Sequence, residues 1–151
     1  MIIGVISDTH VSSLRELPDQ LIEKLAQVDL IVHAGDFTEK AVVDELARLN
    51  DIKAVCGNMD SAEIRRVLSS KELFQAGGKS IGLTHGAGGS GGIRERVSRM
   101  FDRPDIIIYG HSHAPDNEYV HGTLLFNPGA AGKSFGLLTI EDDVKARIVE
   151  L

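Results

Sequence analysis

The chain has 151 residues, a single cysteine and 22 acidic side chains against 16 lysines and arginines, which gives a formal net charge of −6 at pH 7. This length predicts one domain over residues 1–151 with a core that needs no disulfide, and the lone Cys56, which cannot form an internal one, fits a reducing, cytoplasmic compartment. The acidic charge disfavours extended nucleic acid as a partner, and we expect neither a signal peptide nor a membrane span, which needs about 18 consecutive apolar residues.

Apolar runs bounded by glycine, aspartate or asparagine predict buried strands in the first two-thirds of the chain. These runs cover residues 1–7, 29–34, 52–56, 80–84 and 105–109. Helices are predicted between them, one opening at Pro18, one over about 39–49 with Thr38 as its cap, and one from Ile93 to just before Pro104. After His113, short strands are predicted at about 117–120, 123–127, 135–140 and 144–150. This order of elements predicts an α/β fold with two packed sheets flanked by helices.

Polar side chains follow the strands at nearly even intervals, roughly one strand-plus-crossover unit apart. The segments are Asp8-Thr9-His10, Gly35-Asp36, Gly57-Asn58, His85-Gly86 and Gly110-His111-Ser112-His113. Open α/β sheets expose ligands at the carboxyl ends of their strands, so we expect these side chains to share one rim. Carboxylate and amide oxygens suit Mg or Mn, whereas imidazole suits Fe, Ni and Zn. Because the donors are more than one ion needs, we predict two divalent ions, Mn first with Ni, Fe, Zn or Mg as alternatives, and Asp36 as the bridge.

In order and spacing these segments resemble the calcineurin-like metallophosphoesterases, and within them the small single-domain branch that includes bacterial and archaeal phosphodiesterases and a eukaryotic retromer subunit. The resemblance covers almost the whole chain, and it implies a four-layer α/β/β/α sandwich of two mixed β-sheets flanked by helices. It also implies one metal held by Asp8, His10, Asp36 and His113, and a second held by Asp36, Asn58, His85 and His111.

The function implied by the resemblance is hydrolysis of small phosphodiester substrates through a dinuclear metal centre and a metal-bound hydroxide. Asn58 would contact a phosphate oxygen, and His10 would lie near the leaving group. A homo-oligomer is left open. The alternative function is a catalytically weak protein-binding scaffold of the retromer-subunit type.

Two positions depart from the family pattern. Met59 follows the asparagine where many members have a histidine, and a thioether cannot donate a proton to the leaving group. We expect Asp60 to orient a histidine ring at position 59, and in this chain that ring is absent. Because general acid help is typically worth about 10²–10⁴-fold, activity on ordinary phosphomonoesters is put in doubt. Ala87 replaces the second histidine of the His-Gly-His that relatives often carry after the position of His85.

Arginines gather on the helix predicted to start near Ile93. Arg96, Arg99 and Arg103 share one face by their spacing. They form either a solvated face balanced by Glu95 and Asp102 or a clamp for a substrate phosphate.

A glycine-rich loop and two histidines also carry alternatives. Residues 86–92 form either a turn that receives an anion before a helix or a floppy surface loop. His33 is either an ordinary polar residue or a support for Asp36. We expect His121 to be a turn residue before Gly122.

Overall fold

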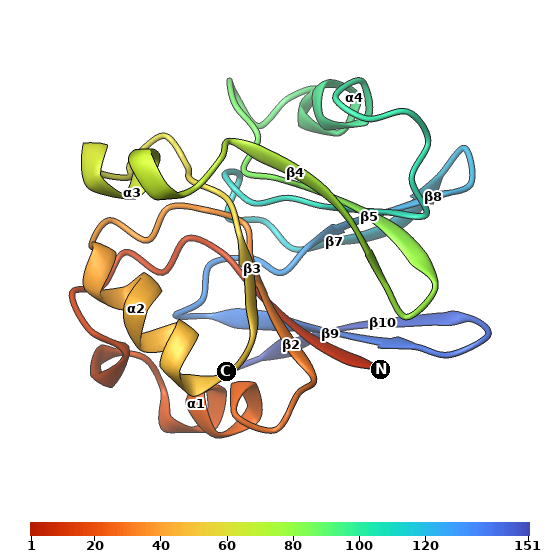
Figure 1. The fold of residues 1–151 in the computed structure, drawn as a ribbon. Helices are drawn as coiled ribbons and strands as arrows, with labels where there is room; N and C mark the ends of the chain where they lie inside the picture. The colour runs from red at the N-terminus through yellow and green to blue at the C-terminus, as the bar shows by residue number, and fades with distance from the viewer.

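The computed structural model describes residues 1–151, in which two five-stranded sheets pack face to face (Figure 1). The strands of the first sheet are β1 (Ile2–Ile6), β2 (Leu30–His33), β3 (Ile52–Ala54), β9 (Ser134–Ile140) and β10 (Val144–Glu150). They lie in the order β10-β9-β1-β2-β3. β1, β2 and β3 are parallel, whereas β9 runs antiparallel to β1 and to β10, so the sheet is mixed.

The second sheet is built in the same mixed way. Its strands are β4 (Lys71–Ala76), β5 (Lys79–Thr84), β6 (Ile106–Ile108), β7 (Asp116–Val120) and β8 (Thr123–Asn127). They lie in the order β4-β5-β6-β8-β7, with β5, β6 and β8 parallel and the two edge strands antiparallel to their neighbours.

Helices cover the outer faces of both sheets. They are the 3₁₀ helix η1 (Leu14–Glu16), α1 (Asp19–Leu25), α2 (Lys40–Leu49), α3 (Ala62–Val67) and α4 (Ile93–Ser98). Leu21 of α1 and Leu46 of α2 are fully buried in a cluster with side chains of the first sheet, and Ile64 of α3 joins that cluster. Val97 of α4 packs on the outer face of the second sheet (Figure 1). The predicted α/β/β/α sandwich of two mixed sheets is therefore confirmed.

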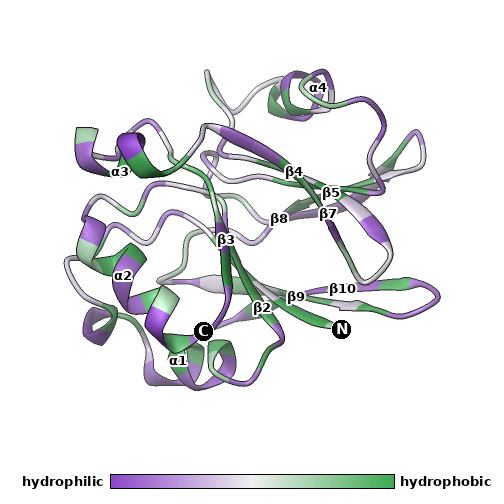
Figure 2. Ribbon diagram, viewed as in Figure 1, coloured by the Kyte–Doolittle hydropathy of each residue, from purple (hydrophilic) through white to green (hydrophobic).

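The core between the sheets follows from the alternation of side chains along each strand. Ile106 and Ile108 of β6 face the other sheet, whereas Ile107 and Tyr109 face α4. Figure 2 shows hydrophobic colour over most of β2 and mixed colour on the helices. No helix of the chain is both long and apolar enough to cross a membrane.

Helix α3 is absent from the sequence prediction, and three further details of that prediction are wrong. Thr38 does not cap α2, because Glu39 is the capping residue and makes no side-chain bond, while Thr38 has a φ of 74° in the preceding loop. The third predicted helix ends at Ser98 instead of continuing to Pro104. Strand β4 was not predicted, because its alternate side chains are exposed at the edge of the sheet and form no apolar run.

Candidate metal centre

The predicted ligands meet where parallel strands of both sheets end. Asp8 follows β1, Asp36 follows β2, His85 follows β5 and His111 follows β6. The backbone of most ligands is left-handed, with φ of 54° at Asp8, 61° at Asp36 and 68° at His111. Residues other than glycine rarely adopt this conformation, and such strain concentrates at functional sites.

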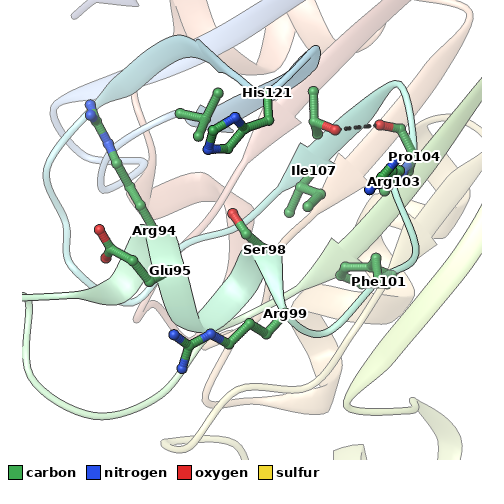
Figure 3. Close-up of a pocket in the computed structure, with 11 residues that line it drawn as sticks. Arg94, Glu95, Ser98, Arg99, Phe101, Arg103, Pro104, Ile107 and His121 are labelled. Atoms are coloured by element: carbon green, nitrogen blue, oxygen red, sulfur yellow. Dashed lines mark hydrogen bonds between the residues drawn. The ribbon is translucent and has the colours of Figure 1, made fainter.

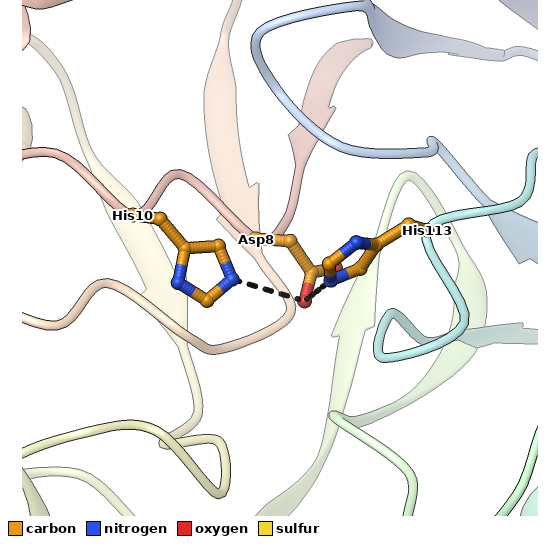
Figure 4. Close-up of side chains that lie close together, drawn as sticks. All are labelled: Asp8, His10 and His113. Atoms are coloured by element: carbon orange, nitrogen blue, oxygen red, sulfur yellow. Dashed lines mark ion pairs between the residues drawn. The ribbon is translucent and has the colours of Figure 1, made fainter.

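The Asp8 carboxylate lies at the middle of the cluster. Its Oδ2 accepts hydrogen bonds from Ser7 Oγ at 2.7 Å and from the His111 backbone N–H at 3.2 Å. Its Oδ1 is buried and has no hydrogen-bond partner. Oδ1 lies 3.2 Å from Nε2 of His113, 3.8 Å from Nε2 of His85 and 3.9 Å from Nε2 of His10 (Figure 4). A buried carboxylate oxygen without a hydrogen bond, faced by three imidazoles, fits a bound cation.

Asp36 reaches histidines on two sides. Its Oδ2 lies 3.2 Å from Nε2 of His85 and 3.7 Å from Nε2 of His10. Its Oδ1 accepts a hydrogen bond from the Met59 backbone N–H at 2.8 Å. Burial opposes the charge, but the hydrogen bonds from His85 and Met59 outweigh it and lower the pKa of Asp36. The carboxylate is therefore ionised and available to a cation at neutral pH.

His85 is oriented by a backbone carbonyl. Its Nδ1–H donates to the Ala34 carbonyl at 2.7 Å, so Nε2 faces the cluster. Burial opposes protonation, yet the hydrogen bond and charge of Asp36, with the charge of Asp8, raise the pKa of His85. The two carboxylates therefore favour positive charge at the position of the His85 ring.

Asn58 and His111 complete the same side of the cluster. The Asn58 Oδ1 lies 3.0 Å from Nε2 of His85 and 3.2 Å from Nδ1 of His111. The Nε2–H of His111 donates to the Gly88 carbonyl at 2.7 Å, which turns Nδ1 toward Asn58. The Asn58 Oδ1, the His85 Nε2 and the His111 Nδ1 thus lie close together, as the ligands of one metal ion would.

Two groups of donor atoms can each hold an ion, with the atoms of each group within 4.8 Å of one another. One group is Asp8, His10 and His113, and the other is Asp8, Asp36 and His85. The residue common to both groups is Asp8, whereas the sequence suggested Asp36. All seven predicted donors lie at this site, and how they divide between ions stays a prediction.

His33 supports the loops that carry the ligands. Its Nδ1 accepts a hydrogen bond from the Gly35 N–H at 3.0 Å, its Nε2 lies 3.2 Å from Thr9 Oγ1, and its ring stacks on Phe37. Complete burial lowers the pKa of His33, so the ring stays neutral. Of the two alternatives for this residue, the structure favours support of the Asp36 loop.

Asp60 is a supporting residue whose role the sequence did not reveal. Its Oδ2 accepts hydrogen bonds from the backbone N–H groups of Asp36 at 3.0 Å and Gly57 at 2.7 Å, and its Oδ1 accepts one from Thr38 at 2.8 Å. Three of the roughly four acceptor sites of the carboxylate are therefore used by the backbone, and the orientation of a ring at position 59 by Asp60 stays a prediction. The carboxylate fixes the backbone on both sides of the Asp36 ligand.

The glycine-rich loop is organised by Arg96. The guanidinium donates to the carbonyls of Ala87 and Gly91, each at 2.8 Å, and to that of Gly89. The loop therefore turns three carbonyl groups toward the Arg96 guanidinium. Carbonyl oxygens do not bind an anion, so this arrangement does not support the anion-binding alternative.

Comparisons with known proteins find a matching family and related structures. The sequence pattern of the calcineurin-like phosphoesterase superfamily domain matches residues 1–143. A probable metallophosphoesterase of Methanocaldococcus jannaschii is 34% identical over 165 residues, covering 100% of this chain and 82% of the relative. An archaeal phosphodiesterase structure has a TM-score of 0.82 at 26% identity, covering 100% of both chains. The zinc complex of wild-type Vps29 from Entamoeba histolytica has a TM-score of 0.78 at 27% identity, covering 99% of both chains.

Proposed function

Because the chain belongs to the calcineurin-like phosphoesterase superfamily, we propose that it is a phosphodiesterase that hydrolyses small phosphodiesters with two divalent metal ions. The ions are held by Asp8, His10, Asp36, Asn58, His85, His111 and His113. Mn²⁺ is the metal expected to give the highest activity, because the donors are mixed oxygen and nitrogen atoms.

The observation that carries the proposal is the unpartnered Oδ1 of Asp8 among three imidazoles. A buried carboxylate oxygen without a partner costs stability, and a cation bound at that place would offset the cost. The donor set is complete, and the orienting contact of His85 with Ala34 is formed.

Divalent ions in such a site lower the pKa of water and offset negative charge on phosphoryl oxygens. The chain's own residues bind and orient the substrate. Asn58 is exposed, and its side-chain NH₂ makes no hydrogen bond within the chain, so it can donate to a non-bridging phosphate oxygen. His10 is partly exposed beside both carboxylates and lies where it can contact the leaving group.

Position 59 favours diesters with good leaving groups. Met59 is 59% exposed beside the centre, and its thioether cannot protonate a departing oxygen. Alkoxides that leave poorly would need that proton. The cavities beside the ligands have volumes of about 230 Å³ next to Asn58 and His85 and about 310 Å³ next to Ser112, which suits small substrates.

The second candidate function is a protein-binding scaffold. It is supported by the likeness to Vps29, whose wild-type structure holds zinc. A scaffold would bind a partner protein without hydrolysing a substrate. Its partner binding would therefore survive substitutions that remove metal-dependent activity. The complete donor set supports the enzyme instead.

A metal-by-substrate activity matrix tests the proposal. Chelated protein is reconstituted with Mn, Ni, Fe, Zn or Mg and assayed on an activated diester and on its matching monoester. We expect diester hydrolysis to exceed monoester hydrolysis with every active metal, and the Asp36→Asn protein to serve as the inactive control. No diester hydrolysis with any metal, in a folded protein that binds them, would favour the scaffold. A monoester rate above the diester rate would contradict the substrate class.

A further inference from the structure

The largest cavity of the chain lies away from the metal centre. It has a volume of about 830 Å³ and opens between α4 and the starts of β6 and β8 (Figure 3). Pro104 at its edge precedes β6, whereas the ligand His111 follows the other end of that strand. The cavity therefore lies toward the opposite end of the sheet and contains no metal ligand, and it shares only Arg94 and Glu95 with the cavity next to Ser112.

The cavity combines an apolar floor with a basic edge. Phe101, Ile107 and Val120 supply the apolar surface. Figure 3 shows Arg94, Arg99 and Arg103 around the edge of the pocket, with Ser98 and Ile107 near its middle. Glu95 is the single carboxylate among the lining residues.

Two of the three arginines have no acidic partner. Arg94 is paired, with Nε donating to Asp116 at 2.9 Å and NH1 to Glu118 at 3.3 Å. Arg99 and Arg103 have no carboxylate within 4.0 Å and donate no side-chain hydrogen bond. Neither arginine forms an ion pair with Glu95 or Asp102, and Arg103 lies beyond the end of α4 at Ser98, so the predicted helical face of Arg96, Arg99 and Arg103 is wrong.

These unpaired charges stand in an acidic protein. The chain carries a net charge of −6, and within it Arg99 and Arg103 place two unpaired guanidinium groups at the edge of one cavity. The guanidinium of an exposed arginine can donate two hydrogen bonds to one anion. The apolar floor beside it can contact an apolar part of the same ligand.

The backbone at the edge is also unusual. Eight residues other than glycine have positive φ, and six of them belong to loops that carry metal ligands. The remaining two, Arg103 at 47° and His121 at 51°, both line this cavity. The two-residue turn of His121 and Gly122 between β7 and β8 requires positive φ, as the sequence predicted for a turn residue. Arg103 lies in no such hairpin. Its backbone nevertheless has the left-handed conformation that favours glycine, so the arginine is strained at this position.

We propose that this cavity binds an organic phosphate of about the size of a mononucleotide. Arg99 and Arg103 supply the cationic contacts to the phosphate, and the apolar floor receives a flat, weakly polar group such as a base. The volume falls within the range of roughly 300–1,000 Å³ typical of small-molecule sites. The proposal is independent of the metal-dependent reaction.

Calorimetric titration of the full chain with AMP tests the proposal, both metal-loaded and after chelation. We expect AMP to bind in both states, because no metal ligand lines the cavity. Arg99→Gln and Arg103→Gly should each weaken binding by about tenfold or more, as loss of a charged hydrogen-bonding partner does. Glycine accepts the left-handed backbone, so Arg103→Gly should not lower the melting temperature. Arg48→Gln, at an exposed arginine of α2, is the matched control and should bind AMP as the unaltered chain does.

Adenosine, ribose 5-phosphate and inorganic phosphate separate the two halves of the ligand. Each should bind more weakly than AMP, and amide shifts in NMR spectra should concentrate at residues 98–107 and 120–123. AMP binding that disappears on chelation would place the ligand at the metal centre and overturn the proposal. So would absence of binding at millimolar AMP, equal binding of AMP and inorganic phosphate, or unchanged affinity in both cavity variants.

Discussion

Replacing Asp8 with asparagine should stabilise the metal-free protein while removing its response to metal. In the structure, Oδ1 of Asp8 is buried without a hydrogen bond, while Oδ2 accepts from Ser7 and from the His111 backbone. An asparagine can keep its oxygen at the Oδ2 position and place its NH₂ group 3.2 Å from Nε2 of His113, where the imidazole can accept a hydrogen bond. The substitution therefore satisfies the one buried polar side-chain atom that has no partner.

That single atom sets the upper limit of the effect, because the variant also loses the attraction between the Asp8 carboxylate and a protonated His85 ring. An unsatisfied buried polar group costs about 1–3 kcal/mol. For a chain of this size each kcal/mol shifts the melting temperature by roughly 2–4 °C, so the metal-free Asp8→Asn protein should melt roughly 2–12 °C higher. Metal at about one hundred times its dissociation constant stabilises a protein by about 2.7 kcal/mol, and the variant should lose most of this because Asp8 belongs to both donor groups.

Thermal unfolding of both proteins, with chelator and with saturating Mn²⁺, measures the two effects. We expect the order of stability to reverse when metal is added. Asp142→Asn, at an exposed aspartate, is the control and should leave both melting temperatures unchanged. A metal-free variant that melts below the unaltered chain, or one that keeps its full metal-induced shift, would refute the role assigned to Oδ1 of Asp8.

Further predictions concern the bridge, the leaving group and pH. Asp36→Asn should lower metal affinity and diesterase rate more than His85→Ala, because Oδ2 of Asp36 faces histidines on two sides; equal losses below about tenfold would show that Asp36 does not bridge. Met59→His should flatten the dependence of the rate on leaving-group pKa and raise monoesterase activity, because an imidazole can protonate the departing oxygen; identical slopes in two folded, metal-loaded proteins would contradict this. Burial lowers the pKa of His33, so its contribution to stability is complete above the ordinary value of 6.5 and is lost as pH falls below it. His33→Asn should therefore lose less melting temperature than the unaltered chain between about pH 7.5 and 5, and an equal loss would exclude His33 as the cause.

The sequence predicted the fold well where burial is continuous. β1 and β2 are covered on both faces, so their residues are mostly apolar and the predicted limits lie within a few residues of the observed ones. β4 lies at a sheet edge, and α3 has only six residues, so neither leaves a strong periodic pattern.

The members of the candidate site were predictable because each ligand follows a strand, and parallel strands bring their ends to one rim. The contacts among these side chains were not predictable, because they depend on how distant segments of the chain pack together. Asp60 binds N–H groups on both sides of Asp36, which lies 24 positions earlier in the chain. The unpartnered oxygen of Asp8 and the unpaired Arg99 and Arg103 likewise arise only when distant segments fold together.

Stepwise reconstitution of the chelated protein, with metal content and diesterase rate measured in the same samples, tests the central claim most directly. A centre of two divalent ions predicts saturation at two ions per chain, no activity in excess chelator, and a rate that rises with occupancy of the second ion, with Mn²⁺ restoring the most. Full activity in excess chelator, or saturation at one ion per chain with full activity, would contradict the claim.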